Sequence, residues 1–79
     1  QGGAELDLFV QAGGRRIGFE FKVGDAPKMT KSLSIAQTDL ALDELLVVKP
    51  TGRGYSLERK IRVLSLEETL QFCNDIAKG

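Results

Sequence analysis

The sequence predicts an α/β domain in which a mixed sheet opens with a β-hairpin and is flanked by helices. Residues 4–11 and 15–23 alternate between apolar and polar side chains, the period of half-buried strands, and a Gly-Gly pair separates them. A helical stripe over residues 29–42 and a short apolar run over 45–48 follow. With the later elements, the predicted order is ββαβ(β)βα.

The register of the predicted hairpin follows from its turn, because Gly13-Gly14 suits a two-residue type I′ turn. Apolar residues then face one another across the two strands, and the full set of expected pairs is Ala12 with Arg15, Val10 with Ile17, Leu8 with Phe19, Asp7 with Glu20, and Glu5 with Lys22. The charged residues share one face, where Gly18 is expected to leave an open patch. The opposite face, with Leu6, Leu8, Val10, Ile17, Phe19, Phe21 and Val23, is apolar.

The strand is expected to break at residues 24–27, and a helix over 29–42 is expected to begin at a cap, either Thr30 or Asp25. Its inward stripe is Met29, Leu33, Ala36 and Leu40. A strand at 45–48 then implies a right-handed crossover and parallel pairing with the hairpin.

Short strands are predicted at residues 55–57 and 61–64, followed by a capping box in which Ser65 caps the helix and Glu68 stands three residues later. The last helix extends to about Ile76. Its expected inward residues are Leu66, Leu70, and either Cys73 or Phe72.

Composition places limits on the function. The 79 residues suit one domain, over residues 4–77, and residues 1–3 are interpreted as a cut end or cloning remnant. Eleven basic residues balance eleven acidic ones, so no general nucleic-acid affinity is indicated, and the absence of histidine excludes Ser-His-Asp triads.

Cys73 is expected to be a small core residue. With no long apolar run, we expect no membrane partner and a cytoplasmic location.

Acids and a lysine on one strand face predict a cation site. Mg²⁺ prefers oxygen ligands and usually takes one or two carboxylates from the protein. Glu20 and Lys22 lie two residues apart on one strand, Asp7 faces them from the other, and Glu5 is a candidate third acid. A lysine beside a metal-activated water can orient that water or offset the charge that develops.

These residues match a family pattern. An Asp on one strand and Glu-x-Lys on the next resembles the PD-(D/E)xK nuclease superfamily, and Gly3-Ala4-Glu5-Leu6-Asp7 with Gly18-Phe19-Glu20-Phe21-Lys22 resembles the C-terminal domain of prokaryotic AAA-type ATPases. The resemblance implies a restriction-endonuclease-like fold within a larger ATPase. It also implies Mg²⁺ or Mn²⁺ held by Asp7 and Glu20, a catalytic Lys22, and DNA as substrate. Leu6 stands where the motif usually has proline.

Alternative interpretations remain open. The polar face of the hairpin could be merely solvated, with a Glu5–Lys22 pair worth at most about 1 kcal/mol. That interpretation explains Asp7 opposite Glu20 poorly, since like charges directly opposed destabilise a sheet. Four basic residues are candidate phosphate contacts: Arg15, Arg16, Lys28 and Lys31. The three hypotheses are a Mg-dependent nuclease-like domain, a non-catalytic assembly module of the same fold that binds its parent ATPase or a second copy, and a plain α/β domain.

Overall fold

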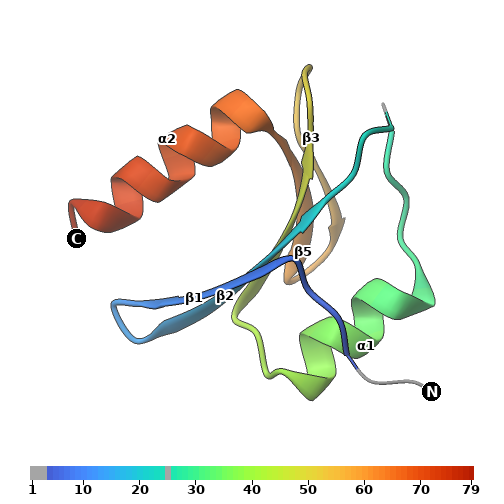
Figure 1. Cartoon of the computed structure of the whole chain (residues 1–79), viewed down its shortest axis with the longest axis horizontal. Helices are drawn as coiled ribbons and strands as arrows, with labels where there is room; N and C mark the ends of the chain where they lie inside the picture. The colour runs from blue at the N-terminus through green and yellow to red at the C-terminus, as the bar shows by residue number, and fades with distance from the viewer. Residues whose placement is uncertain (1–3, 25) are drawn as a thin grey trace.

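The computed structural model describes residues 4–24 and 26–79. In chain order the elements are β1 (Leu8–Ala12), β2 (Arg15–Phe21), α1 (Lys31–Asp39), β3 (Glu44–Lys49), β4 (Tyr55–Glu58), β5 (Ile61–Ser65) and α2 (Leu66–Ala77). The strands of the described residues form one mixed sheet in the order β1-β2-β3-β5-β4, with α1 and α2 on opposite sides of it (Figure 1). The predicted fold class is confirmed.

The hairpin has the predicted register over the length of β1. Leu8 pairs with Phe19, Val10 with Ile17 and Ala12 with Arg15. Gly13 and Gly14 both have positive φ, 58° and 76°, as a type I′ turn requires. Because that conformation is costly for residues with a Cβ, the Gly-Gly pair sets the register from the turn outward.

The first strand begins later than predicted, at Leu8, because the chain bends at Asp7. The bend carries Leu6 to the α1 side of the sheet, so the expectation that it shares a face with Leu8 is wrong. Gly18 was expected to leave an open patch, and this is also wrong. A Cβ built on Gly18 would lie 2.7 Å from Leu42 Cδ1 and 2.8 Å from Leu6 Cδ1, so these two side chains occupy the space.

The central strand β3 joins the two halves of the sheet. It pairs in parallel with β2 on one side and with β5 on the other, as the strand-helix-strand order predicted for the first of these pairs. Its apolar run is buried on both faces, which is the usual environment of a parallel strand. Leu45 and Val47 join the core under α1, and Leu46 and Val48 join the core under α2.

Helix α1 begins at the cap Thr30, whose hydroxyl accepts a hydrogen bond from the Leu33 N–H. The alternative cap, Asp25, lies outside the described residues. Leu33 and Ala36 are buried, and Met29 and Leu40 pack against the same core, as predicted. In the part of the chain that the structure describes, neither helix is long and apolar enough to cross a membrane.

Helix α2 begins with the predicted capping box. The Ser65 hydroxyl accepts from the Glu68 N–H, and the Glu68 carboxylate accepts from the Ser65 N–H. We expect Ser65→Ala to lower the free energy of unfolding by about 1 kcal/mol, because it leaves a helix N–H without its partner. Urea denaturation measures this. An unchanged unfolding midpoint would contradict it, and Ser56→Ala on the edge strand β4 is the control.

The inward face of α2 agrees with the prediction at Phe72, one of the two alternatives given, and differs from it elsewhere. Phe72 and Ile76 pack against the core, and Thr69 is buried. Leu66 and Leu70, expected to point inward, are 49% and 63% exposed, and Cys73 is an exposed thiol rather than a core residue. Since Ser65 is both the last residue of β5 and the helix cap, the strand fixes the rotation of α2 about its axis, and it turns a second apolar stripe away from the core.

Candidate cation site

Asp7 and Glu20 meet at the bend. The Asp7 N–H donates to the Phe19 carbonyl at 3.1 Å, and the Phe21 N–H donates to Asp7 Oδ2 at 2.8 Å. These two bonds lie on either side of Glu20 along β2, so they hold Asp7 beside it. The predicted neighbourhood of the two acids therefore forms, although Asp7 is at the bend rather than within a continuous strand.

The lysine of the predicted cluster lies just beyond the end of β2. The Lys22 N–H donates to the Val48 carbonyl at 2.9 Å, which fixes its backbone to β3. Its Nζ lies 3.7 Å from Glu20 Oε2, too long for a strong hydrogen bond and suited to a loose ion pair. The lysine head is about half exposed, at 47%, so it remains available to a ligand.

Glu5 is exposed in the segment that precedes the bend. Since the ladder ends at Leu8, the expected Glu5–Lys22 cross-strand pair does not form, and Lys22 pairs with Glu20 instead. Among the described residues, His, Cys, Asp and Glu side chains do not gather in any group of three or more that could hold a metal. The acids that the fold brings together are therefore Asp7 and Glu20, and a metal-binding role for Glu5 stays a prediction.

The electrostatics of the pair single out Glu20. Partial burial, followed by the nearby Asp7 charge, raises the pKa of Glu20 above its ordinary value, and Lys22 opposes the rise. Raised carboxyl pKa values are frequent at functional sites, because such sites concentrate like charges.

This pKa predicts a pH dependence of stability. With a raised pKa, the folded chain binds the Glu20 proton more tightly than the unfolded chain does. Glu20 therefore contributes stability that is fully present below its unfolded pKa near 4.5. This contribution is lost as the pH rises through the raised pKa of the folded chain. We expect Asp7→Asn to bring the pKa of Glu20 back toward its ordinary value, as followed by carboxyl-carbon NMR. A pKa that stays unchanged would show that burial alone raises it.

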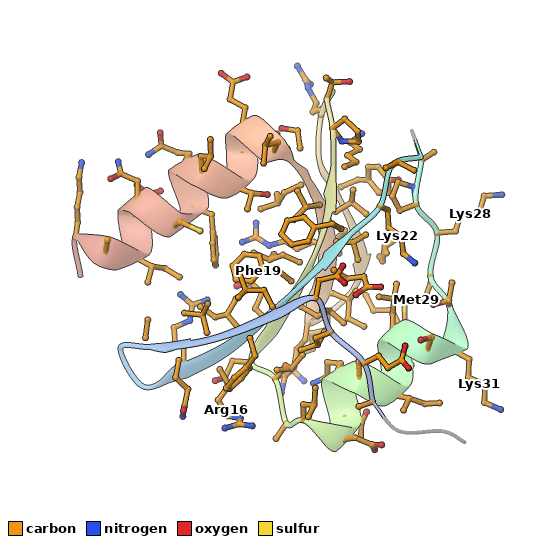
Figure 2. All side chains as sticks on the ribbon, viewed as in Figure 1. Arg16, Phe19, Lys22, Lys28, Met29 and Lys31 are labelled. Carbon is orange, nitrogen blue, oxygen red and sulfur yellow. The ribbon has the colours of Figure 1, made fainter. Side chains whose placement is uncertain are left out.

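Two of the predicted phosphate contacts make contacts within the chain. Arg15 pairs with Glu44 at 2.7 Å. The Arg16 guanidinium donates to the Leu40 carbonyl at 3.0 and 2.7 Å and lies over the Phe9 ring. Arg16 lies toward the turn end of the hairpin, away from Lys22 (Figure 2). Their predicted role with phosphate stays a prediction.

Lys28 and Lys31 lie on the same side of the molecule as Lys22 (Figure 2). Lys22, Lys28 and Thr30 all line one pocket of about 430 Å³, with Val47 from β3 contributing to its wall. Gln37, on α1, does not line this pocket, because its side-chain amide donates to the Leu42 carbonyl just after the helix, at 2.9 Å. The chain thus places Lys28 along one pocket with Lys22, the ion-pair partner of Glu20.

Sequence reasoning missed a second polar cluster. Glu44 pairs with Arg62 at 2.5 Å as well as with Arg15, and both guanidiniums lie over the Phe72 ring. It also missed the Lys49 ammonium over the ring of Tyr55. The contacts of Glu44 and Phe72 join residues of different helices and strands, ten or more positions apart, so no local spacing in the sequence could indicate them. They fix the hairpin and α2 to the centre of the sheet.

Comparison with known proteins places the chain in a family. The model of the family described as "Domain of unknown function (DUF4143)" matches residues 1–69. Uncharacterised proteins of Mycobacterium bovis and Mycobacterium tuberculosis are each 34% identical to the chain over 67 residues, which is 85% of this chain and 15% of each relative. No solved structure matches. The chain belongs to the DUF4143 family.

Proposed function

We propose that this domain is a Mg²⁺-dependent, nuclease-like module in which Asp7 and Glu20 hold the cation, Lys22 faces the attacking water, and DNA is the substrate. The observation that supports the proposal most directly is the acid pair itself. Asp7 is tied by its own backbone and side chain to the strand that bears Glu20, so two negative charges are held together at a cost in free energy. A bound divalent cation removes that cost.

The donor set fits the proposed metal. Two carboxylates fall within the usual protein contribution, one or two, to a Mg²⁺ site that is completed by water and by substrate phosphate. When bound, Mg²⁺ would polarise a phosphate oxygen and lower the pKa of a water ligand. Lys22, with its head half exposed beside Glu20, would orient that water and offset charge on the phosphate. Lys28 and Lys31 would contact the neighbouring backbone phosphates.

The test is a Mn²⁺ and Mg²⁺ titration followed by backbone amide NMR. We expect Mn²⁺ broadening to centre on Asp7, Glu20 and Lys22, and Asp7→Asn to weaken binding about tenfold or more by removing one charged ligand. Asparagine keeps an oxygen that can accept the Phe21 N–H, so the bend is retained. Cleavage of DNA by the wild-type chain, and not by Lys22→Ala, would then test the chemistry.

The chain offers a matched control. Asp43 Oδ2 accepts the Arg16 N–H at 2.8 Å near the other end of β2, the same kind of bond that Asp7 makes with Phe21. Asp43→Asn should therefore leave Mn²⁺ broadening unchanged. Equal weakening by both substitutions would mean that the cation responds only to net charge, and no broadening at all up to about 10 mM would contradict the metal site.

A non-catalytic module of the same fold is the second candidate, acting through protein contacts within a larger AAA-type ATPase. An apolar groove beside α2 favours it, since exposed apolar patches of this kind mark interaction sites. The matched stretch is also only 15% of each mycobacterial relative, so those proteins contain further sequence in which a partner surface is to be sought. A normal fold that lacks both the Mn²⁺ response and cleavage would favour this candidate.

A further inference from the structure

An open apolar groove of about 600 Å³ runs between α2 and the β1–β2 hairpin. In Figure 1 α2 extends from the end of β5 toward the turn of the hairpin, and Phe72 and Ile76 on its inner side pack against the core that includes Ile17 and Phe19 of β2. Leu8 and Phe21 form part of the sheet wall and are 47% and 50% exposed. Leu66 and Leu70 form part of the helix wall.

Helix α2 has two apolar stripes, and its own domain uses only one of them. Thr69, Phe72 and Ile76 pack on the sheet. The second stripe, which we call the α2 seam, consists of Leu66, Leu70, Cys73 and Ala77, all exposed and all lining the groove. At 3.6 residues per turn, the two stripes lie about a quarter-turn apart. The apolar arc of α2 is therefore about twice as wide as its own packing requires.

The spacing of the α2 seam points to a helix as its partner. Successive seam residues are four, three and four positions apart, the alternation of core positions in paired helices. An isolated helix packing on a sheet does not need this repeat. A second α2 with the same seam satisfies it along its whole length.

Charge favours an antiparallel pairing. The first turn of α2 carries Glu67 and Glu68, and Lys78 caps its end. An antiparallel pair places the acidic start of each helix beside the lysine at the end of the other, and it opposes the two helix dipoles favourably. A parallel pair would instead place the two acidic first turns beside each other. A twofold axis through the middle of the seam produces the antiparallel arrangement.

We propose that a second copy of this chain occupies the groove, with the two α2 seams packed antiparallel about a twofold axis and the exposed hairpin residues Leu8 and Phe21 covered at the edges. The interface is isologous, because one surface supplies both the helix seam and the apolar wall that receives it. It is independent of the proposed cation site, which lies on the α1 side of the sheet. A failure of one proposal therefore leaves the other standing.

Sedimentation velocity of the chain over about 1–500 μM tests the proposal, because self-association depends on concentration by mass action. We expect the apparent mass to rise from 8.6 kDa toward twice that value. Leu70→Glu should weaken the association about tenfold or more by placing a charge at the centre of the seam. The control Gln71→Glu adds the same charge on the outer side of α2, and it should leave the association unchanged.

Cys73 gives a second measurement that needs no substitution. Its exposed thiol lies in the seam. The rate constant for its reaction with a maleimide should therefore fall as the concentration of the chain rises. A chain that stays monomeric over the whole range, with a constant Cys73 reaction rate, would overturn the proposal and leave the groove to a segment of a longer polypeptide. A dimer that Leu70→Glu and Gln71→Glu affect equally would also overturn it.

Discussion

Replacing Leu45 with alanine is expected to lower the free energy of unfolding by about 2–5 kcal/mol. Leu45 is fully buried on β3, between two parallel neighbours, and it packs in the core beneath α1. The surrounding backbone is held on both sides by strand hydrogen bonds, so the cavity cannot close by local movement. A 79-residue domain has a total stability of about 4–12 kcal/mol, so this one change removes a large share of it.

Urea denaturation followed by circular dichroism measures the effect. Ile35→Ala is the matched control, because it removes a side chain of similar size from α1. Ile35 is 37% exposed, and alanine favours the helix. We expect the control to change stability by less than about 1 kcal/mol. Equal losses for the two variants would mean that β3 is not the rigid centre of the fold.

The hairpin and the centre of the sheet could be predicted from the sequence because local signals agree there. Period-two alternation on both sides of Gly13-Gly14 leaves one register that buries the apolar residues. The Ser65 and Glu68 pair likewise places the start of α2 to the residue. In each case the deciding contacts lie within a few residues along the chain.

The bend at Asp7 could not be predicted, because the alternation continues through it. The sequence shows Leu6 in phase with Leu8, yet Leu6 packs on the α1 side. The cause is distant along the chain. Gly18 on β2, together with Leu42 after α1, forms the slot that Leu6 fills. Alternation reports only the local period, and a long-range packing site overrides it.

The candidate site, too, could be predicted from the sequence only in part. The proximity of Asp7 to Glu20 follows from the hairpin register, so it could be predicted. The contacts of Arg15 with Glu44 and of Arg16 with the Leu40 carbonyl depend on where α1 ends and β3 begins. The spacing of residues in the sequence therefore does not predict these contacts. The rotation of α2 is similarly set by its junction with β5, since two adjacent apolar stripes satisfy helical periodicity equally well.

Gly18→Ala is expected to destabilise the chain by about 1–3 kcal/mol, because an added methyl group overpacks a filled core. The new Cβ would lie 2.7 Å from Leu42 Cδ1 and 2.8 Å from Leu6 Cδ1, and both distances are too short for carbon atoms. Leu42 is buried, with 1% exposure, so Leu6 is the side chain with room to move. Urea denaturation measures the loss, and Gly24→Ala, with open space around it, is the control.

The same substitution links the core to the candidate site. Leu6 directly precedes Asp7, so a displaced Leu6 draws the Asp7 carboxylate away from Glu20. We therefore expect Gly18→Ala to lower the pKa of Glu20 toward its ordinary value, as measured by carboxyl-carbon NMR. Shortening Leu6 in the Leu6→Ala, Gly18→Ala double variant should recover about 1 kcal/mol relative to the sum of the single losses. Strictly additive losses would mean that Leu6 does not fill the Gly18 slot, and that another contact fixes the bend at Asp7.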